Sequence, residues 1–443
     1  MRNLIYKLKN NKFIKSVCSL SAGVLLAQLI GLITTPIVSR LYSPSAYGDY
    51  AIIVSVSSII SSLASLGLNS AIMSGVSDEE CKIIFSVTFW ISVVFVIVAC
   101  ILLISISAWV KLFNAGINYI TACILISCLT IFNLLSSLLS IYMNKKGLNK
   151  ALMINSVIGA LATLFITIPL GVCKLNMYGM YLAAVFSAML CSLLMIRKEN
   201  PFKVIKILDI KAVFLNQRKY ILYQYPANII DTITYQMPAQ VYSNVYGNNA
   251  LGGYNMSEKI LGIPMRLVAA PINTIYFRTA TEYTREKKDL SKFTFKLLIY
   301  ILLIAFIPMI ITILFAEPIF SFILGEGWKI AGQYASIMIL YYVFRFCTTS
   351  ISYCRVVIGK QNTNFLMSFI NLAIVASSLA LGILVFQEII YAILCFVVSY
   401  SLLNLIDLTI SLKCLGKYWV KFFIFALAYW LINVILIIIT IKR

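Results

Sequence analysis

Long apolar segments recur along almost the whole chain and are separated by short polar connections. A helix needs about 20 mainly apolar residues to cross the hydrocarbon core of a bilayer. Thirteen segments meet this requirement: 16–39, 47–73, 83–110, 117–143, 151–173, 175–196, 220–246, 250–277, 293–316, 330–354, 363–386, 389–412 and 422–441. The seventh, eighth and tenth are the most polar. This pattern predicts an all-α polytopic membrane protein.

The connections between these segments are too short to hold a further domain. The longest, residues 197–219, has about the length of one more helix, so it has no room for a catalytic domain. At the N-terminus, a basic stretch precedes 24 uncharged residues from Ser16 to Ser39. That run is too long for the core of a signal peptide, and we expect it to form the first membrane helix.

The composition excludes soluble classes of protein and most familiar enzyme chemistry. The 443 residues are 61% hydrophobic and 12% charged, whereas soluble domains are about half apolar and a quarter charged. The chain has no histidine, no C-x-x-C among its 11 cysteines and no G-x-x-x-x-G-K-[ST] phosphate loop. Histidine-dependent triads, His-ligated metals and a resident ATPase are therefore not expected. We predict a protein that is not an enzyme and has no cofactor beyond a coupling ion such as Na⁺ or H⁺.

The net charge is +21, and most of the Lys and Arg residues lie on one side of the predicted helices. With the N-terminus in the cytoplasm, the cytoplasmic connections hold 27 of the 36 Lys and Arg residues, and the opposite side holds 6. Cytoplasmic loops of membrane proteins have this excess. The charge therefore predicts orientation in the bacterial inner membrane and contact with anionic lipids rather than with nucleic acid. Thirteen spans leave the C-terminus outside, unless segment 422–441 is interfacial or pairs with the twelfth helix.

Short motifs recur about halfway along the chain. Residues 42–50 read YSPSAYGDY and residues 246–254 read YGNNALGGY, with Tyr, Ala, Gly and Tyr at a constant offset of 204. Residues 142–147 and 353–359 share a Tyr followed by a Gly, at offsets of 211 and 212. Because six helices separate the copies, both keep the same orientation in the membrane. This predicts a parallel duplication of the kind found in alternating-access transporters.

The duplication divides the chain into four predicted parts. These are a six-helix lobe over 1–196, a cytoplasmic basic linker over 197–219, a second six-helix lobe over 220–412 and an extra apolar segment over 413–443. Two pseudo-symmetric bundles of this kind enclose a central cavity in alternating-access transporters.

Three cations fall inside the apolar segments, where an ionisable group is costly and usually functional. At about 1.5 Å per residue, Arg266 lies roughly 18 Å and Arg345 roughly 14 Å from the cytoplasmic ends of their helices. Lys259 is two helical turns from Arg266 on the same face, and Gln28 lies at the level of Arg266. We predict that these four residues line a cationic lumen that binds an anion such as pyrophosphate or a uronic acid. The alternative is a structural salt bridge of Glu258 with Arg266 or Lys259.

The seventh segment is unusually rich in polar residues. Asp231 lies roughly 16 Å from its cytoplasmic end, and Asn371 and Asn404 lie roughly 12 Å deep in the eleventh and twelfth segments. Oxygen ligands at similar depth predict a site for Na⁺, or a proton on Asp231, and Glu258 is a further candidate for ion coupling. Interhelical hydrogen bonds are the alternative role of such amides. Asp407 is near a helix end, and we expect it to snorkel toward the headgroups.

Several motifs are shared with a known family. They are Ala27-Gln28, Pro36, Arg40-Leu41-Tyr42-Ser43-Pro44 and Tyr47-Gly48 in the first half, and Ala250-Leu251-Gly252-Gly253-Tyr254 and Leu324-Gly325-Glu326-Gly327-Trp328 with Ala331 in the second. In these motifs the chain resembles the Wzx-type oligosaccharide-lipid flippases. Those proteins form the polysaccharide-synthesis branch of the multidrug/oligosaccharidyl-lipid/polysaccharide exporter superfamily. The resemblance spans almost the whole chain.

The resemblance implies two six-helix lobes around a V-shaped cavity that opens alternately to each side of the inner membrane. It implies transport of an undecaprenyl-pyrophosphate-linked oligosaccharide, such as an O-antigen or capsule repeat unit of lipopolysaccharide or polysaccharide biosynthesis. Lys259 and Arg266 match the cations expected to engage the diphosphate. Asp231 and Asn371 match part of a Na⁺ site that some relatives have. The pathway's polymerase and chain-length regulator are the expected protein partners.

Two other functions are consistent with parts of the sequence. A cation-coupled multidrug or small-molecule exporter of the same superfamily would have an acid-dominated cavity, whereas the deep charges here are mainly cationic. A membrane polysaccharide polymerase or ligase typically has a large external loop with catalytic Arg or His, and this chain has neither that loop nor a histidine. An ion gradient or consumption of the substrate, rather than bound ATP, is expected to drive transport.

Overall fold

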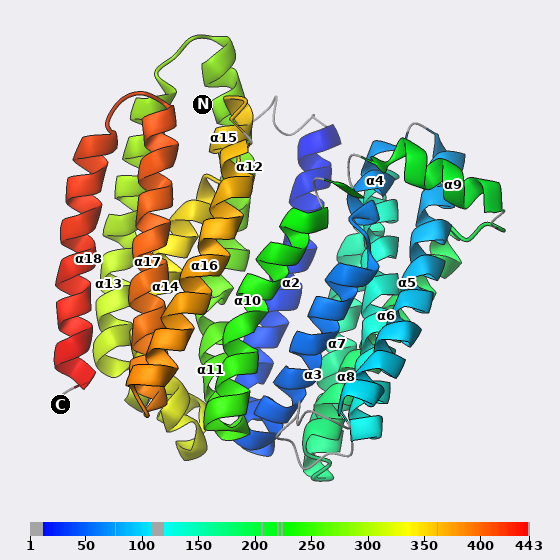
Figure 1. The fold of residues 1–443 in the computed structure, drawn as a ribbon, viewed down its shortest axis with the longest axis horizontal. Helices are drawn as coiled ribbons and strands as arrows, with labels where there is room; N and C mark the ends of the chain where they lie inside the picture. Colours follow the sequence, from blue (N-terminus) through cyan, green and yellow to red (C-terminus); the bar gives the residue numbers. More distant parts are fainter. Residues whose placement is uncertain are drawn as a thin grey trace. The chain divides into compact units, whose positions relative to one another are not determined.

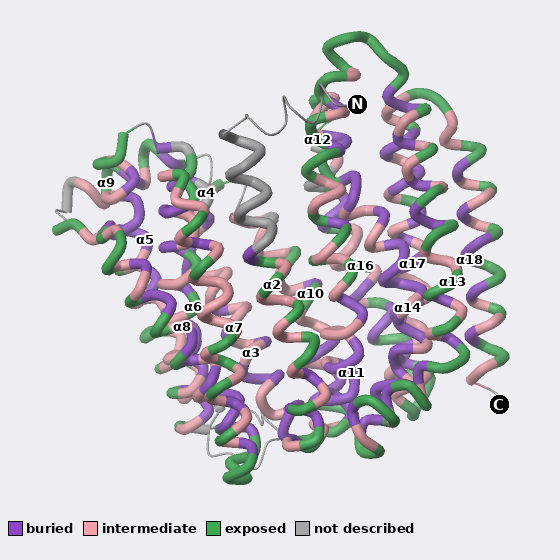
Figure 2. The backbone as a smooth tube through the Cα atoms, turned by 180° about the vertical axis from the view of Figure 1, so that it is seen from behind, coloured by how far each residue is buried: buried purple, intermediate pink, exposed green. Residues whose placement is uncertain are grey.

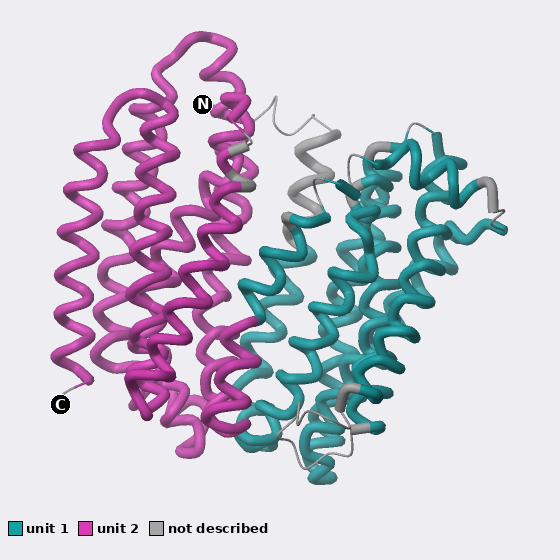
Figure 3. Tube along the Cα trace, in the orientation of Figure 1, with its two compact units in different colours: residues 1–236 teal, residues 237–443 magenta. Residues whose placement is uncertain are grey.

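The structure is a computed structural model, which describes residues 12–75, 77–107, 119–204, 207–218, 221–222, 225–360 and 362–441. Every regular element in this described part is a helix. Within it, 12 helices are long and apolar enough to cross a membrane. The chain is therefore an all-α multi-pass membrane protein, as its hydrophobic pattern predicts. It divides into two compact units, residues 1–236 (unit 1) and 237–443 (unit 2) (Figure 3).

Unit 1 contains six of the apolar helices and two shorter helices. In chain order they are α2 (Lys12–Leu41), α3 (Pro44–Ala64), α4 (Leu68–Ser74), α5 (Asp78–Ser107), α6 (Tyr119–Lys145), α7 (Asn149–Val172), α8 (Met177–Lys198) and α9 (Ile207–Asn216) (Figure 1). The start of α3 follows directly from its sequence. The Ser43 side chain accepts a hydrogen bond from the backbone N–H of Ala46, and Pro44 occupies the first turn, where its missing N–H has no cost.

Unit 2 contains the other six apolar stretches, and two of them, Asn248–Arg285 and Glu326–Val357, are broken by short irregular turns. Its elements are α11 (Asn248–Leu261), the π-helical turn η2 (Met265–Ala269), α12 (Ala270–Arg285), α13 (Leu290–Leu324), the 3₁₀ turn η3 (Glu326–Trp328), α14 (Lys329–Ser350), α15 (Cys354–Val357), α16 (Asn362–Val385), α17 (Ile389–Cys414) and α18 (Trp419–Ile441).

The seventh predicted segment, 220–246, differs from the other twelve. It forms α10 (Tyr225–Tyr246), whose 22 residues are long enough to cross a membrane. Its polar residues leave it outside the set of strongly apolar helices, which the other twelve predicted segments match one for one. The boundary between the units falls within α10, after Gln236. The lobe and linker boundaries at 196 and 220 remain predictions.

The two units pair their helices in the same order. In unit 1, α5 packs against α6, α6 against α8, α7 against α8, and α3 against α6. The corresponding pairs in unit 2 are α13 with α14, α14 with α17, α16 with α17, and α11 with α14. A parallel duplication produces this shared order.

The repeated tyrosines make equivalent hydrogen bonds within their own units. The Tyr42 hydroxyl donates to the backbone oxygen of Thr167 in α7 at 2.8 Å. The Tyr246 hydroxyl donates to the backbone oxygen of Phe386, directly after α16, at 3.4 Å. Because α7 and α16 hold the same place in the pairing order, these bonds support the duplication at the level of single residues.

The repeated glycines end equivalent spans, which are α6 in unit 1 and the stretch of α14 and α15 in unit 2. Gly147 follows α6 and Gly359 follows α15, and both have φ of +71°. In each case the next residue's N–H returns to a carbonyl five residues earlier, Leu148 to Met143 and Lys360 to Arg355. This is the Schellman arrangement, in which a left-handed residue closes a helix and glycine fits without strain.

The last apolar segment forms α18, which packs against α13, α14 and α17. The indole N–H of Trp430 donates to the Ser401 hydroxyl of α17 at 2.8 Å, and the side chains of Phe422 and Asn433 are fully buried. The sequence left open whether segment 422–441 is interfacial or pairs with the twelfth predicted helix. In the structure it pairs with that helix, α17.

Large apolar residues are exposed along the spans of both units, and Figure 2 shows exposed residues recurring along the helices. Ile304 and Phe322 of α13 are 75% and 84% exposed, and Leu384 of α16 is 83% exposed. Exposed apolar surface on this scale indicates contact with another apolar phase, which for these helices is lipid.

Candidate functional site

A polar pocket of about 570 Å³ lies within unit 1, between α3, α4, α6 and α10. Every residue that lines it has a polar side chain. They are Ser57, Ser58, Ser61, Ser62, Ser65, Asn69, Asn133, Asn228, Asp231, Thr232, Tyr235 and Gln236. A pocket lined in this way is unusual in a helix bundle whose composition is 61% hydrophobic.

Helical periodicity explains why two helices supply most of the lining. The serines of α3 lie at intervals of three and four residues between 57 and 65, so they share one face of the helix. The α10 residues between 228 and 236 have the same spacing. The sequence thus builds a polar stripe on each helix, and packing turns both stripes toward one space.

Hydrogen bonds connect the two stripes. The Thr232 hydroxyl lies 3.1 Å from the Ser62 hydroxyl and 2.7 Å from the backbone oxygen of Asn228. The Tyr225 hydroxyl donates to the backbone oxygen of Leu63 at 2.8 Å. These bonds position α10 against the C-terminal half of α3 and fix the width of the pocket.

Asp231 provides the single carboxylate among the described lining residues. Its side chain is exposed, and the neighbouring Tyr235 is 44% exposed. The predicted coupling residue therefore lies in a pocket of hydroxyl and amide groups, where an exposed carboxylate can bind a cation or exchange a proton.

A break in the α11–α12 stretch places the two predicted cations of unit 2. α11 ends at Leu261, and the π-helical turn η2 follows, with Arg266 as its second residue. The Arg266 side chain folds back, and its Nη2 donates to the backbone oxygen of Lys259 at 3.0 Å. The structure thus brings Arg266 and Lys259 together, with Arg266 exposed and Lys259 half-buried.

Arg345 and Asn404 also come together in unit 2. The Arg345 guanidinium donates to the Tyr341 hydroxyl one turn earlier in α14 and lies 5.5 Å from the centre of that ring. The Thr348 hydroxyl lies 2.9 Å from the backbone oxygen of Arg345 and 3.3 Å from the side-chain oxygen of Asn404 in α17. Thr348 therefore connects the two predicted residues.

The other predicted residues occupy separate elements. Gln28 is half-buried in α2 of unit 1, whereas Glu258 in α11 and Asn371 in α16 are half-buried in unit 2. Asp231 belongs to unit 1. The predicted cationic lumen and the predicted ion site remain predictions.

A family model described as "Polysaccharide biosynthesis protein" matches residues 37–333, which is more than half of the chain. The chain belongs to this family. No curated protein sequence matches it significantly.

Several transporters of known structure have the same fold as this chain at low sequence identity. The lipid II flippase MurJ, in an inward closed conformation, has 17% identity and a TM-score of 0.70, with 95% of this chain and 96% of that chain covered. An inward-facing multidrug resistance MATE family transporter of the MOP superfamily has 13% identity and a TM-score of 0.61 over 90% and 94% of the chains. A MOP superfamily transporter from Pyrococcus furiosus has 13% identity and a TM-score of 0.60 over 93% and 98%. The predicted transporter fold is confirmed.

An ion pair in unit 2 corrects one expectation from the sequence. Asp407 does not snorkel, because its carboxylate pairs with Arg355, whose side chain is only 5% exposed. The Arg355 Nη2 also donates to the backbone oxygen of Asp407 at 2.9 Å. The prediction for Asp407 is wrong because Arg355, counted from the sequence among the loop cations, turns inward where α14 breaks before α15.

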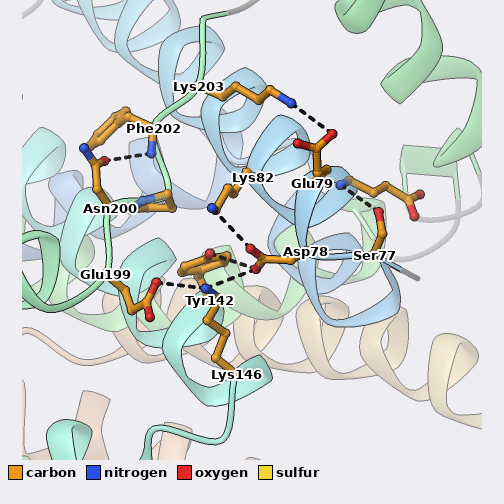
Figure 4. Close-up of polar contacts among 12 residues, drawn as sticks. Ser77, Asp78, Glu79, Lys82, Tyr142, Lys146, Glu199, Asn200, Phe202 and Lys203 are labelled. Atoms are coloured by element: carbon orange, nitrogen blue, oxygen red, sulfur yellow. Dashed lines mark hydrogen bonds and ion pairs between the residues drawn. The ribbon is translucent and has the colours of Figure 1, made fainter.

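A second polar cluster escaped the sequence reasoning, at the end of unit 1 where α5 begins and α8 ends (Figure 4). Asp78 accepts a hydrogen bond from the Tyr142 hydroxyl at 2.9 Å and pairs with Lys82 and Lys146. Lys146 also pairs with Glu199 at 2.8 Å, and this hydrogen bond raises the pKa of Lys146. Through Lys146, these ion pairs hold the residue after α8 close to the start of α5.

One feature of the sequence predicts part of the pocket, although the apolar character of α3 as a whole obscures it. The serines of α3 repeat at helical spacing between 57 and 65, which places them on one face. The matching stripe between 228 and 236 stands out in the sequence only as general polarity. No local sequence pattern predicts that the two stripes face each other, because they are more than 160 residues apart in sequence.

Among the residues that the structure describes, no group of three His, Cys, Asp or Glu is placed to hold a metal ion.

Proposed function

We propose that this protein is a flippase for an undecaprenyl-pyrophosphate-linked oligosaccharide, such as an O-antigen or capsule repeat unit. It moves the glycan from the cytoplasmic to the periplasmic leaflet of the bacterial inner membrane by alternating access, with its N-terminus in the cytoplasm. Membership of the polysaccharide biosynthesis family supports the glycan substrate. The fold shared with a lipid II flippase supports the flipping of a lipid-linked headgroup.

The main observation behind the proposal is an exposed arginine inside a membrane-spanning stretch. Arg266 lies within the candidate span Asn248–Arg285, at the π-helical turn, beside Lys259. A guanidinium has five N–H donors, and the bond to Lys259 uses one to orient the group. Arg binds phosphate with paired hydrogen bonds. Arg266 and Lys259 therefore engage the diphosphate while the polyprenyl chain stays in lipid, and Arg345 adds a further cation in unit 2.

Coupling to an ion gradient belongs to the same proposal. Asp231 takes up H⁺ or binds Na⁺ in its pocket, and no bound ATP is required. In vesicles that contain the purified protein, an imposed Na⁺ or H⁺ gradient should accelerate transport by the wild type and leave the rate of D231N unchanged. Gradient-independent transport by the wild type would remove Asp231 from this role.

Arg266 variants test the substrate interaction in cells. R266A should lower surface polysaccharide at least about tenfold at matched protein level, since it removes charge-assisted hydrogen bonds to the diphosphate. R266K should retain partial display because Lys keeps the charge but loses paired hydrogen bonding. R285A, at the end of α12, is the control and should be normal. Normal display by R266A would refute the proposed anion contact.

A cation-coupled small-molecule exporter is the second candidate function. The exposed Asp231 in the polar pocket favours it, as does the fold shared with a multidrug resistance transporter. Cells that overproduce the protein should then survive higher concentrations of cationic drugs, whereas a flippase leaves drug sensitivity unchanged.

A further inference from the structure

The pocket in unit 1 has the chemistry of a carbohydrate site rather than of a phosphate site. Eleven of its twelve lining residues present a hydroxyl or amide group, the twelfth is Asp231, and none of these described residues is basic. A diphosphate needs cations or clustered N–H donors. We infer that the pocket binds the uncharged sugars of the lipid-linked glycan, an assignment that rests on the proposed flippase function.

The hydroxyl groups of α3 are arranged to accept hydrogen bonds from a ligand. The Ser58 hydroxyl donates to the backbone oxygen of Val54 at 2.8 Å, Ser65 to Ser62 at 3.1 Å, and Ser57 to Ile126 at 3.3 Å. Each hydroxyl that donates its proton keeps lone pairs that accept. The α3 face of the pocket therefore offers oxygen acceptors, and sugar hydroxyls supply the matching donors.

Asn69 shows where a donor is missing. This residue lines the pocket, and its buried Oδ1 atom has no hydrogen-bond partner among the described residues. A buried acceptor without a partner is destabilising and unusual in folded proteins. When the Asn69 side chain turns this oxygen toward the pocket, a sugar hydroxyl or acetamido N–H satisfies it.

The size of the pocket favours a sugar over a single ion. Its 570 Å³ falls in the range of small-molecule sites, about 300–1,000 Å³, whereas a cation is enclosed by oxygens only about 2.3–2.6 Å away. Tyr235 lines the pocket, is 44% exposed overall, and has an aromatic ring on which the apolar face of a pyranose can pack. Asn133 of α6 lines the same pocket and adds an amide group to it.

Asp231 restricts the class of sugar further. A carboxylate at the pocket repels a second carboxylate, and like-charge juxtaposition of this kind excludes wrong ligands. Neutral hexoses and N-acetylhexosamines therefore fit the pocket, and uronic acids do not. This differs from the cations of unit 2, which attract acidic groups.

Binding of three synthetic lipids to the full-length protein in nanodiscs tests the inference. The probes are undecaprenyl diphosphate alone, the same lipid with N-acetylglucosamine, and the same lipid with glucuronic acid. The wild type should bind the N-acetylglucosamine lipid about tenfold more tightly than the bare lipid and should gain nothing from glucuronic acid. N69L should lose this preference and keep its affinity for the bare lipid, and D231N should gain affinity for the glucuronyl lipid.

The matched control is N155L, because Asn155 in α7 also has a buried, unpartnered Oδ1 and does not line the pocket. It should keep the preference for N-acetylglucosamine. Both leucine variants should unfold at or above the wild-type temperature, since each removes an unpartnered acceptor. If N69L does not fold, N133A takes its place, because Asn133 is exposed.

The outcomes separate the two proposals. A folded N69L or N133A protein that keeps the full preference overturns the sugar pocket. Tight binding of the bare lipid by the wild type, without a gain from N-acetylglucosamine, also overturns it and leaves the flippase proposal intact. Failure of the wild type to bind any of the three lipids contradicts the flippase proposal itself.

Discussion

At the scale of single residues, the buried pair of Arg355 and Asp407 should dominate the energetics of its surroundings. The arginine side chain is 5% exposed and the aspartate side chain 26% exposed. Removing one partner leaves an uncompensated charge inside the bundle, which costs about 3–5 kcal/mol. We predict that R355A lowers the free energy of unfolding by about this amount, measured by denaturant titration in detergent.

The double variant R355M/D407L is the control for this prediction. It removes both charges and keeps similar side-chain volumes, so it should be much closer to the wild type than either single variant. A loss in the double variant equal to the sum of the two single losses would show that the two residues do not depend on each other.

Single functional candidates could be predicted where a charged residue lies in an apolar segment, because burying a charge there is costly. The sequence identified Arg266 and Lys259 because cations are rare within apolar segments, and the structure brings the two together. It did not reveal Arg355, which lies at a helix end and turns inward only because α14 stops early. Its partner is 52 residues away, and no local pattern specifies such a contact.

At the scale of helices, the glycines that follow the C-terminal ends of α6 and α15 predict equal effects of alanine substitution on stability in the two units. Gly147 and Gly359 both have φ of +71°, and a Cβ atom added at either position would have no neighbour within 4 Å. Alanine at either site should therefore cost only the left-handed backbone strain, roughly 1–2 kcal/mol. Thermal unfolding of G147A and G359A in detergent measures this cost.

Gly31 in α2 provides the comparison, since a side chain there also meets nothing within 4 Å and its backbone is helical. G31A should be neutral or stabilising by roughly 0.5–1 kcal/mol. A G31A loss as large as that of G147A would mean that helix-end geometry is not the cause.

Helix positions could be predicted from hydropathy because each spanning segment must be apolar and must pair its own backbone N–H and C=O groups within the bilayer. Twelve predicted segments match helices of the structure, and α10 is the segment whose polarity already sets it apart in the sequence. The pocket was less predictable, because it depends on which face of α3 meets α10. Spacing places the serines on one face, but only packing determines what that face contacts.

At the scale of the whole molecule, the charge distribution predicts orientation in the membrane. Lys211 in α9 is exposed on the predicted cytoplasmic side, and the native Cys173 after α7 is exposed on the predicted periplasmic side. In intact cells, a membrane-impermeant thiol reagent should label Cys173 and should not label K211C in a C173S background. Labelling of K211C from outside would reverse the topology.

The most direct test of the account is flipping by the purified protein in vesicles. Undecaprenyl-diphosphate glycan placed in both leaflets is about half accessible to an enzyme added outside that modifies the terminal sugar. With the wild-type protein present, accessibility should rise toward completion, and with R266A it should rise at least about tenfold more slowly. Accessibility that stays at the level of protein-free vesicles would contradict the proposed function.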